Sequence, residues 1–239
     1  MQLHKIPGFE STAYAYQNGR VVWVGANPAT DHPRNAWQPW HPATCSLELD
    51  RLQTGASICL SMLDSLSPLR LEVKGLLLWL TNQTLPFPLN LATQRFEAIR
   101  AAMHRRDLTA LEAAALRVLG LGHGLTPSGD DFVGGLLFAL TFRQRFSSGE
   151  TWLDGLPQTA CRISEKARLA TNVISAALLD DLLAGQSYRV LHELLGALNT
   201  QDTDTIRAAA SRLLTLGASS GADLLAGVLL GLGPRADRH

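Results

Sequence analysis

The residues best suited to chemistry lie in one glycine-rich segment near the middle of the chain, GLGHGLTPSGDDF at 120–132. Its glycines let the backbone adopt positive φ angles and approach a ligand closely. His123 lies between two of these glycines, and two adjacent carboxylates, Asp130 and Asp131, open the apolar stretch that follows. A helix start accounts for one Ser and one Asp by itself. The carboxylate pair, the histidine and the density of glycines together therefore predict a ligand site.

The composition of this segment restricts the ligand. Backbone N–H groups at a helix start attract anions, but a Walker-type phosphate loop continues with Lys and Ser or Thr after its last glycine, whereas Asp130 and Asp131 follow here. The signal for a dinucleotide loop is weak, because the G-x-G-x-x-G spacing is missing and a predicted helix, not a strand, precedes the segment. The carboxylates, together with Asp223, instead predict a polar pocket that binds amide-like N–H groups or a hard cation such as Mg²⁺.

Two interpretations of His123 stand side by side. An imidazole titrates close to neutral pH and can act as a general acid or base, which would make it a catalytic group together with Asp130 and Asp131. A hydrogen bond that caps the loop explains the same residue more simply.

The start of the apolar stretch is repeated 92 residues later. Residues 128–135 are SGDDFVGG and residues 220–227 are SGADLLAG. Both contain Ser-Gly-x-Asp, two apolar residues, a small residue and Gly. The repeat predicts two helix N-termini that face one site, the second with Ser220, Gly221 and Asp223. Two unrelated helix starts of similar composition would give the same pattern.

A further polar feature lies on a predicted helix over 159–184. Thr171 and Ser175 are four residues apart, so they share one helix face. A polar face within an apolar helix predicts that these hydroxyls line the same pocket. A solvated stripe is the alternative.

The elements that must position these residues change in character near residue 88. In the first third, Asn18-Gly19 lies between two β-rich runs within 12–24 and predicts a hairpin with a two-residue turn. Short apolar runs bounded by Gly, Pro and Ser predict further strands over 47–50, 56–63 and 69–81.

From Leu89 onward, Ala, Leu, Glu and Arg predict helices. We expect these over 91–118 (one or two helices, the second beginning at Asp107), 130–145, 159–184, 188–198, 203–216 and 221–232. The fold class is therefore α+β. A β-rich N-terminal unit over 1–88, a small sheet or barrel-like, is followed by a mainly α-helical unit over 89–239 that contains the glycine-rich loop 120–129.

The overall composition excludes several classes of protein. The 21 Lys and Arg balance the 21 Asp and Glu, so the basic excess typical of nucleic-acid binding is missing. Hydrophobic residues make up 46% of the chain and 44 residues are Leu. This content excludes disorder and predicts a large buried core, an oligomer interface, or both.

The N-terminus and the cysteines predict the compartment. The chain begins without the apolar region of a secretory signal, and its most apolar stretch, 213–233, contains Asp223 and five glycines, so we expect no membrane span. Cys45, Cys59 and Cys161 are far apart, which indicates neither a zinc site nor a disulfide scaffold. We therefore expect a cytoplasmic protein.

The segment GLGHGLTPSGDDFVGG at 120–135 resembles the signature of a bacterial domain-of-unknown-function family that includes the third subunit of oxamate carbamoyltransferase. RLATNVIS at 168–175 and SSGADLLAG at 219–227 follow in the family's order and spacing. The resemblance implies a cytoplasmic subunit of a multi-protein carbamoyltransferase of allantoin and purine nitrogen use. That system interconverts oxalurate and phosphate with oxamate and carbamoyl phosphate. The resemblance therefore implies other carbamoyltransferase subunits as partners.

The resemblance also implies site residues. Those shared with the family are Gly122, Gly124, Thr126, Pro127, Ser128, Gly129, Asp130, Asp131, Thr171, Ser175, Ser220, Gly221 and Asp223. We expect the helix starts to bind a small carboxylate or phosphate, and Asp130 and Asp131 to hold the carbamoyl NH₂ or Mg²⁺. The Ser-x-Arg-Thr-Arg stretch of ordinary transcarbamoylases is missing from the sequence.

Two other functions fit the same residues. The chain could be a non-catalytic assembly subunit, because Leu-rich helices of low charge suit a permanent apolar interface, including one between copies of itself. It could also be a stand-alone small-molecule-binding protein, because a shared fold does not fix the reaction.

Overall fold

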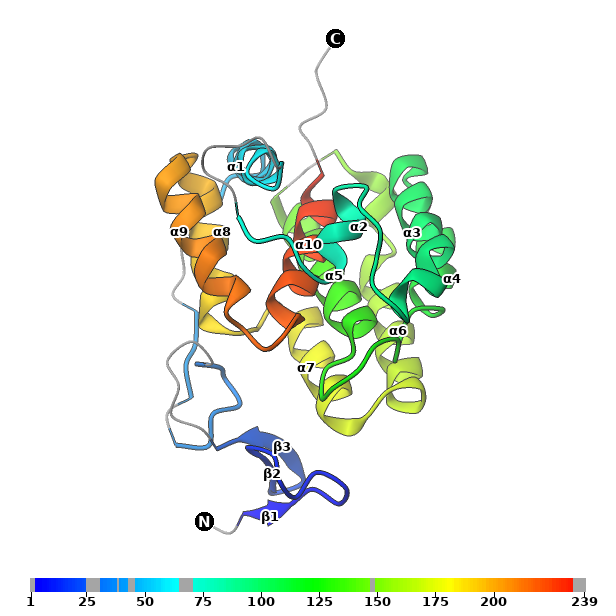
Figure 1. Cartoon of the computed structure of the whole chain (residues 1–239), viewed down its shortest axis with the longest axis vertical. Helices are drawn as coiled ribbons and strands as arrows, with labels where there is room; N and C mark the ends of the chain where they lie inside the picture. The colour runs from blue at the N-terminus through cyan, green and yellow to red at the C-terminus, as the bar shows by residue number, and fades with distance from the viewer. Residues whose placement is uncertain are drawn as a thin grey trace.

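The computed structural model of the chain describes residues 3–24, 31–37, 39–42, 46–64, 71–146 and 149–233. A small sheet lies against one end of a larger helical body (Figure 1). The strands are β1 (His4–Lys5), β2 (Tyr14–Gln17) and β3 (Arg20–Trp23). The α-helices are α1 (Leu49–Ser61), α2 (Leu76–Leu80), α3 (Thr93–Arg105), α4 (Leu108–Ala115), α5 (Ser128–Phe146), α6 (Leu156–Ala170), α7 (Val173–Leu183), α8 (Arg189–Thr200), α9 (Thr203–Leu214) and α10 (Ser220–Leu232). Short 3₁₀ helices cover Leu89–Ala92 and Thr151–Leu153.

The predicted hairpin is confirmed. β2 and β3 pair antiparallel with Gln17 opposite Arg20, which leaves a two-residue turn. Its residues, Asn18 and Gly19, have φ angles of 49° and 76°, the positive values that such a turn requires. β1 pairs antiparallel with β2, so the sheet has the order β1-β2-β3. Together with the helices that follow, this small sheet confirms the α+β fold class.

The strands expected over 47–50, 56–63 and 69–81 are wrong. The first two ranges coincide largely with α1, and the third contains α2, although its first two residues lie outside the described part of the chain. In α1, Leu52 and Ala56 are fully buried four residues apart, which is the spacing of one helix face. Short apolar runs alone do not separate such a helix from a buried strand.

The helices expected after residue 88 are present, with one difference. The break before α4 falls at Asp107 as predicted, and its side chain caps the helix. The single helix expected over 159–184 is wrong, because α6 and α7 separate at Asn172. Its side-chain oxygen accepts hydrogen bonds from the N–H groups of Ile174 and Ser175, the bonds of a strong N-cap.

α5 and α10 form the centre of the helical body (Figure 1). A Cβ atom at Gly135 would lie 2.3 Å from the Leu224 carbonyl oxygen, and one at Gly227 would lie 2.1 Å from the Phe132 carbonyl oxygen. The offset of 92 residues maps Phe132 to Leu224 and Gly135 to Gly227. The two contacts are therefore equivalent, and α5 and α10 run parallel and in register about an approximate two-fold axis.

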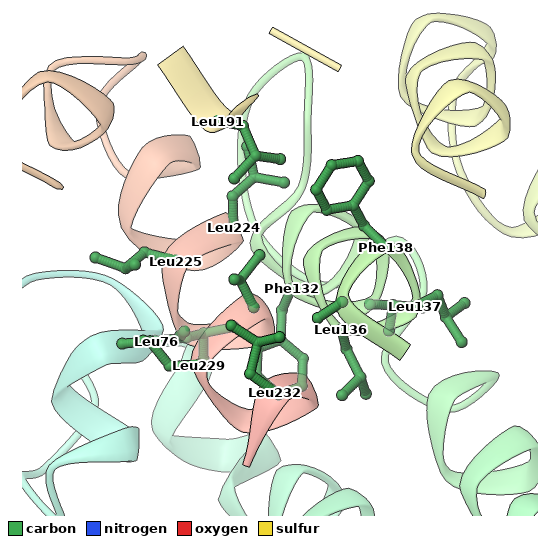
Figure 2. Packing of buried hydrophobic residues seen from close by; sticks show 14 of the residues in the cluster. Leu76, Phe132, Leu136, Leu137, Phe138, Leu191, Leu224, Leu225, Leu229 and Leu232 are labelled. Carbon is green, nitrogen blue, oxygen red and sulfur yellow. The ribbon is translucent and has the colours of Figure 1, made fainter. Parts of the chain in front are cut away.

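The core around this helix pair is apolar. Figure 2 shows Phe132 and Leu136 of α5 beside Leu229 of α10, with Leu76 of α2 close by. Residues of α1 and α2 belong to the same buried cluster as those of the later helices. The division of the chain into units over 1–88 and 89–239 stays a prediction.

The sheet packs on α7. A small apolar cluster joins the two, formed by Ile6, Tyr14, Val21, Ile174 and Leu178. Arg34 reinforces this contact, because its guanidinium donates to the carbonyl oxygens of Val21 and Ala177, both at 3.0 Å, and pairs with the Asp181 carboxylate. The hairpin is therefore held in a defined position relative to the helices.

Within the described part of the chain, no helix combines the length and the apolar character that crossing a membrane requires.

Candidate functional site

The starts of α5 and α10 converge. The hydroxyl oxygens of Thr126 and Ser220 are 2.8 Å apart, and the carboxyl of Asp131 interacts with both of these hydroxyls. In return, Asp223 of α10 interacts with the hydroxyl of Ser128 at the start of α5. Each copy of the Ser-Gly-x-Asp motif thus places its Asp against the Ser of the other copy.

A pocket of about 290 Å³ lies beside the two helix starts. Its polar lining consists of Tyr14, His123, Thr126, Tyr188, Ser219 and Ser220. Gly124 of the glycine-rich loop and Gly217 of the loop before α10 complete two of its walls. Among the described lining residues none is Lys or Arg, so hydroxyl groups dominate the chemistry of the pocket.

Two tyrosines from distant parts of the chain meet at this pocket. The hydroxyl oxygens of Tyr14, in β2, and Tyr188, directly before α8, are 3.3 Å apart. Burial raises the pKa of both phenols, and the nearby Asp131 raises each further. Both therefore remain protonated at neutral pH. Sequence reasoning missed them, because nothing in either local sequence indicates a contact across 174 residues.

Asp131 lies behind the pocket lining, only 7% exposed. Burial raises its pKa well above the usual range, the charge of Asp223 raises it further, and hydrogen bonds with Ser220 and Thr126 oppose the rise. Its Oδ2 atom is buried and has no hydrogen-bond partner in the described part of the chain. Asp131 therefore offers an unused polar atom close to four of the residues that line the pocket.

Asp223 is fully buried. Burial raises the pKa of this carboxyl to about 6, and a hydrogen bond from the backbone N–H of Leu76 opposes the rise. That N–H lies 2.7 Å from Asp223 Oδ1. Asp223 thereby joins α10 to the start of α2, behind the pocket.

Asp130 is occupied by protein donors. Its Oδ1 accepts from the Gly120 N–H at 2.7 Å, and its Oδ2 accepts from the hydroxyls of Ser175, at 2.7 Å, and Thr171. Thr171 and Ser175 thus bind this carboxylate and are not part of the pocket lining that the structure describes. Asp130, Thr171 and Ser175 therefore join the start of the glycine-rich loop to the junction of α6 and α7.

The other residues predicted for the site fall into two groups. His123 is exposed and lies at the pocket, next to Gly122 and Gly124, whose φ angles of 118° and 100° only glycine adopts readily. Gly129 and Gly221 serve packing, because a Cβ atom at either would lie 1.9 Å from a carbonyl oxygen of the preceding segment.

The donor set offers little to a metal ion. The described residues contain no group of three or more His, Cys, Asp or Glu side chains that could hold one. Two buried carboxylate oxygens lack partners there, Oδ2 of Asp131 and Oδ2 of Asp223, whereas Mg²⁺ favours six oxygen ligands. Of the cysteines, Cys45 lies outside the described residues, and burial raises the pKa of the Cys59 thiol to about 12, which indicates a packing role.

The site thus combines paired helix starts with a pocket whose polar lining consists mainly of hydroxyl groups. Residues 118–232 match the family model described as oxamate carbamoyltransferase subunit AllH. This segment, which runs from the glycine-rich loop through α10, belongs to that family, and the resemblance seen in the motifs is confirmed. The match supports a role as a subunit of oxamate carbamoyltransferase, and such a role implies partner subunits. The comparison with solved structures found no match.

Proposed function

We propose that this chain is a cytoplasmic subunit of an oxamate carbamoyltransferase that interconverts oxalurate and phosphate with oxamate and carbamoyl phosphate, in allantoin and purine nitrogen use. In this role it holds a small ligand of the reaction in the pocket. One observation carries the proposal: two copies of one motif, both within the segment that matches the family model, converge beside a hydroxyl-lined pocket.

The pocket provides the groups that carbamoyl transfer requires. A carbamoyl carbonyl is polarised by hydrogen-bond donors that are fixed before the reaction begins, and the hydroxyls of Thr126 and Ser220 are held by each other. Asp131 lies behind the lining and holds the hydroxyls of Thr126 and Ser220 in place, and His123 in the lining is the candidate for proton transfer. Asp130 is a positioning residue, because its carboxylate holds the loop and the α6–α7 junction.

An assembly role is the second candidate, and exposed apolar side chains favour it. Leu169 on α6 is 85% exposed and Leu91 is 76% exposed. Leu169 also lines a shallow hollow together with Leu116 and Leu119. Apolar residues at such positions suit contact with a partner subunit, with or without chemistry in the pocket.

Reconstitution of the complex with its companion subunits tests these two roles. We expect Asp131→Asn to lower the rate of oxalurate phosphorolysis at least tenfold with the complex intact, and the exposed Asp154→Asn to leave it unchanged. An unchanged rate for Asp131→Asn would contradict a catalytic pocket. Leu169→Glu should reduce co-elution of the subunits in size-exclusion chromatography if α6 faces a partner.

A further inference from the structure

We propose that the protein has a second ligand site, in a pocket formed by the N-terminal hairpin, and that this pocket binds a small oxyanion, a carboxylate or a phosphate, through Arg20 and Gln17. The site goes beyond the proposed function. It lies outside the segment 118–232 that matches the family model, and it shares no described lining residue with the pocket beside the two helix starts.

The second pocket lies between the hairpin and the loop that follows it. Its volume is about 340 Å³, which suits a small molecule. Its described lining comes from the hairpin, between Gln17 and Val22, and from the loop, between Pro33 and Pro39. This lining contains two arginines and no Asp or Glu. Its positive charge distinguishes it from the pocket beside the helix starts, whose described lining has no Lys or Arg.

The register of the hairpin places Gln17 and Arg20 side by side. The two residues lie directly opposite each other in β2 and β3, so their side chains project from the same face of the sheet. The other face carries Tyr14 and Val21, which pack on α7. The amide of Gln17 and the guanidinium of Arg20 therefore reach the second pocket from the face that is directed away from α7.

Two guanidinium groups share one carboxylate at this end of the sheet. Arg34 is occupied, because it pairs with Asp181 and donates to the carbonyl oxygens of Val21 and Ala177. Burial raises the pKa of Asp181, and the charges of Arg34 and, more weakly, of Arg20 oppose the rise. Arg20 itself has no hydrogen bond or ion pair in the described part of the chain. One positive charge therefore remains for a ligand.

The donors of the pocket match an oxyanion. A guanidinium is a planar fork that fits two oxygens of a carboxylate or phosphate. The Nε2 atom of Gln17 has no acceptor in the described residues, so no protein group holds this amide and it can turn toward an anion. The carbonyl oxygen of Val21 accepts from Arg34 Nη1, and the N–H of the same strand residue points to the same edge of β3.

The hairpin connects the two pockets. Tyr14 of β2 lines the pocket beside the helix starts, and Gln17 of the same strand lines the second pocket. A bound oxyanion would join the hairpin to the loop between Pro33 and Pro39. It would thereby fix the strand that presents Tyr14.

NMR titration of the full chain with inorganic phosphate and with malonate, at constant ionic strength, tests the site. We expect saturable shifts of the backbone N–H signals of Arg20, Val21 and Val22, with affinity in the millimolar range. The anion that binds more tightly identifies the ligand group as phosphate or carboxylate. Arg20→Gln should weaken this binding at least tenfold, and Gln17→Ala about threefold, as expected for the loss of a charged and of a neutral hydrogen-bond donor.

Arg105→Gln, at the exposed end of α3, is the matched control. It removes the same charge far along the chain and should leave both affinities unchanged. Shifts that do not saturate, an equal loss of affinity in Arg105→Gln, or an affinity that Arg20→Gln does not change would each overturn the site. The signals of Gly124 and Leu125 report on the pocket beside the helix starts, so the ligand of the proposed function is recognised separately.

Discussion

The helix starts of α5 and α10 have the same motif in different surroundings. Both place a Gly against a carbonyl oxygen, and both place an Asp against the other copy's Ser. In the first copy, Asp130 binds three donors, whereas Ala222 takes the equivalent place in the second and lies in the apolar core. The shared glycines therefore serve helix packing, whereas Asp130, which has no counterpart in the second copy, joins the glycine-rich loop to the junction of α6 and α7.

The loops before the two helices show the same contrast. The N–H of Gly129 donates to the Leu121 carbonyl at 2.8 Å, and that of Gly221 donates to the Leu216 carbonyl at 2.9 Å. Gly122 and Gly217, which follow these leucines, both have positive φ angles. From there to the helix the first copy uses five residues, HGLTP, and the second uses two, AS. The longer loop brings the histidine to the pocket.

The largest expected loss of stability comes from substituting the glycines that pack α5 and α10 against each other. Gly227→Ala would place a Cβ atom 2.1 Å from the Phe132 carbonyl oxygen, so the helices must separate and the free energy of unfolding should fall by more than about 4 kcal/mol. Gly135→Ala should cost a similar amount if the two-fold relation holds. Gly196→Ala in α8, where a Cβ atom meets nothing within 4 Å, is the control and should stabilise the helix slightly. Urea unfolding measures all three.

The next largest loss of stability is expected at Asp130, which has no counterpart in the second copy of the motif. Asp130→Ala leaves the Gly120 N–H and the hydroxyls of Thr171 and Ser175 without their acceptor, and we expect a loss of about 3–4 kcal/mol. The exposed cap variant Asp107→Asn retains a capping oxygen and should cost a few tenths of a kcal/mol. Thermal unfolding compares the two. Equal melting temperatures would show that the Asp130 network does not hold the loop.

A pH series isolates the contribution of Asp223 to stability. Burial raises the pKa of Asp223 to about 6, above roughly 3.9 for an unfolded Asp. This carboxyl therefore stabilises the fold fully below about pH 4, and the stabilisation, about 3 kcal/mol, is lost as the pH rises through 6.

Asp223→Asn removes this loss. We expect a gain of about 2 kcal/mol at pH 7, because a buried amide NH₂ offsets about 1 kcal/mol of the 3. The pH dependence that remains belongs to the other buried groups: burial lowers the pKa of His32 to about 3 and that of His192 to about 4, and it raises the pKa values of Asp131 and Asp181. Asp154→Asn should leave the profile of unfolding free energy against pH unchanged, and an identical profile for Asp223→Asn would contradict the assignment.

The smallest expected effect is the coupling energy between the hydroxyls of Thr126 and Ser220, which join the starts of α5 and α10. Thr126→Val and Ser220→Ala each remove one hydroxyl of a 2.8 Å pair, and a coupling energy of about 1 kcal/mol is expected from a double-mutant cycle. A coupling of zero would mean that the two loops are held independently.

The sequence predicted local features of this fold well. The Asn18-Gly19 turn and the Asp107 cap follow from backbone geometry within four residues. The strands expected over 47–81 were wrong because the burial of α1 and α2 depends on α8 and α10, which short apolar runs do not reveal.

The site was predicted in part for a similar reason. The glycine-rich loop and its repeat stand out in the sequence, and they do converge. The partners of Asp130 and the meeting of Tyr14 with Tyr188 depend on how separate elements pack. Such contacts become visible only when the fold is known.

The two-fold relation of α5 and α10 has one more consequence. The same contacts would arise between two identical chains about a symmetry axis, where every substitution occurs on both sides at once. Within one chain, one side can change alone, as Asp130 and Ala222 show. A ligand whose two ends differ chemically needs half-sites that also differ, and a covalently joined pair can provide them.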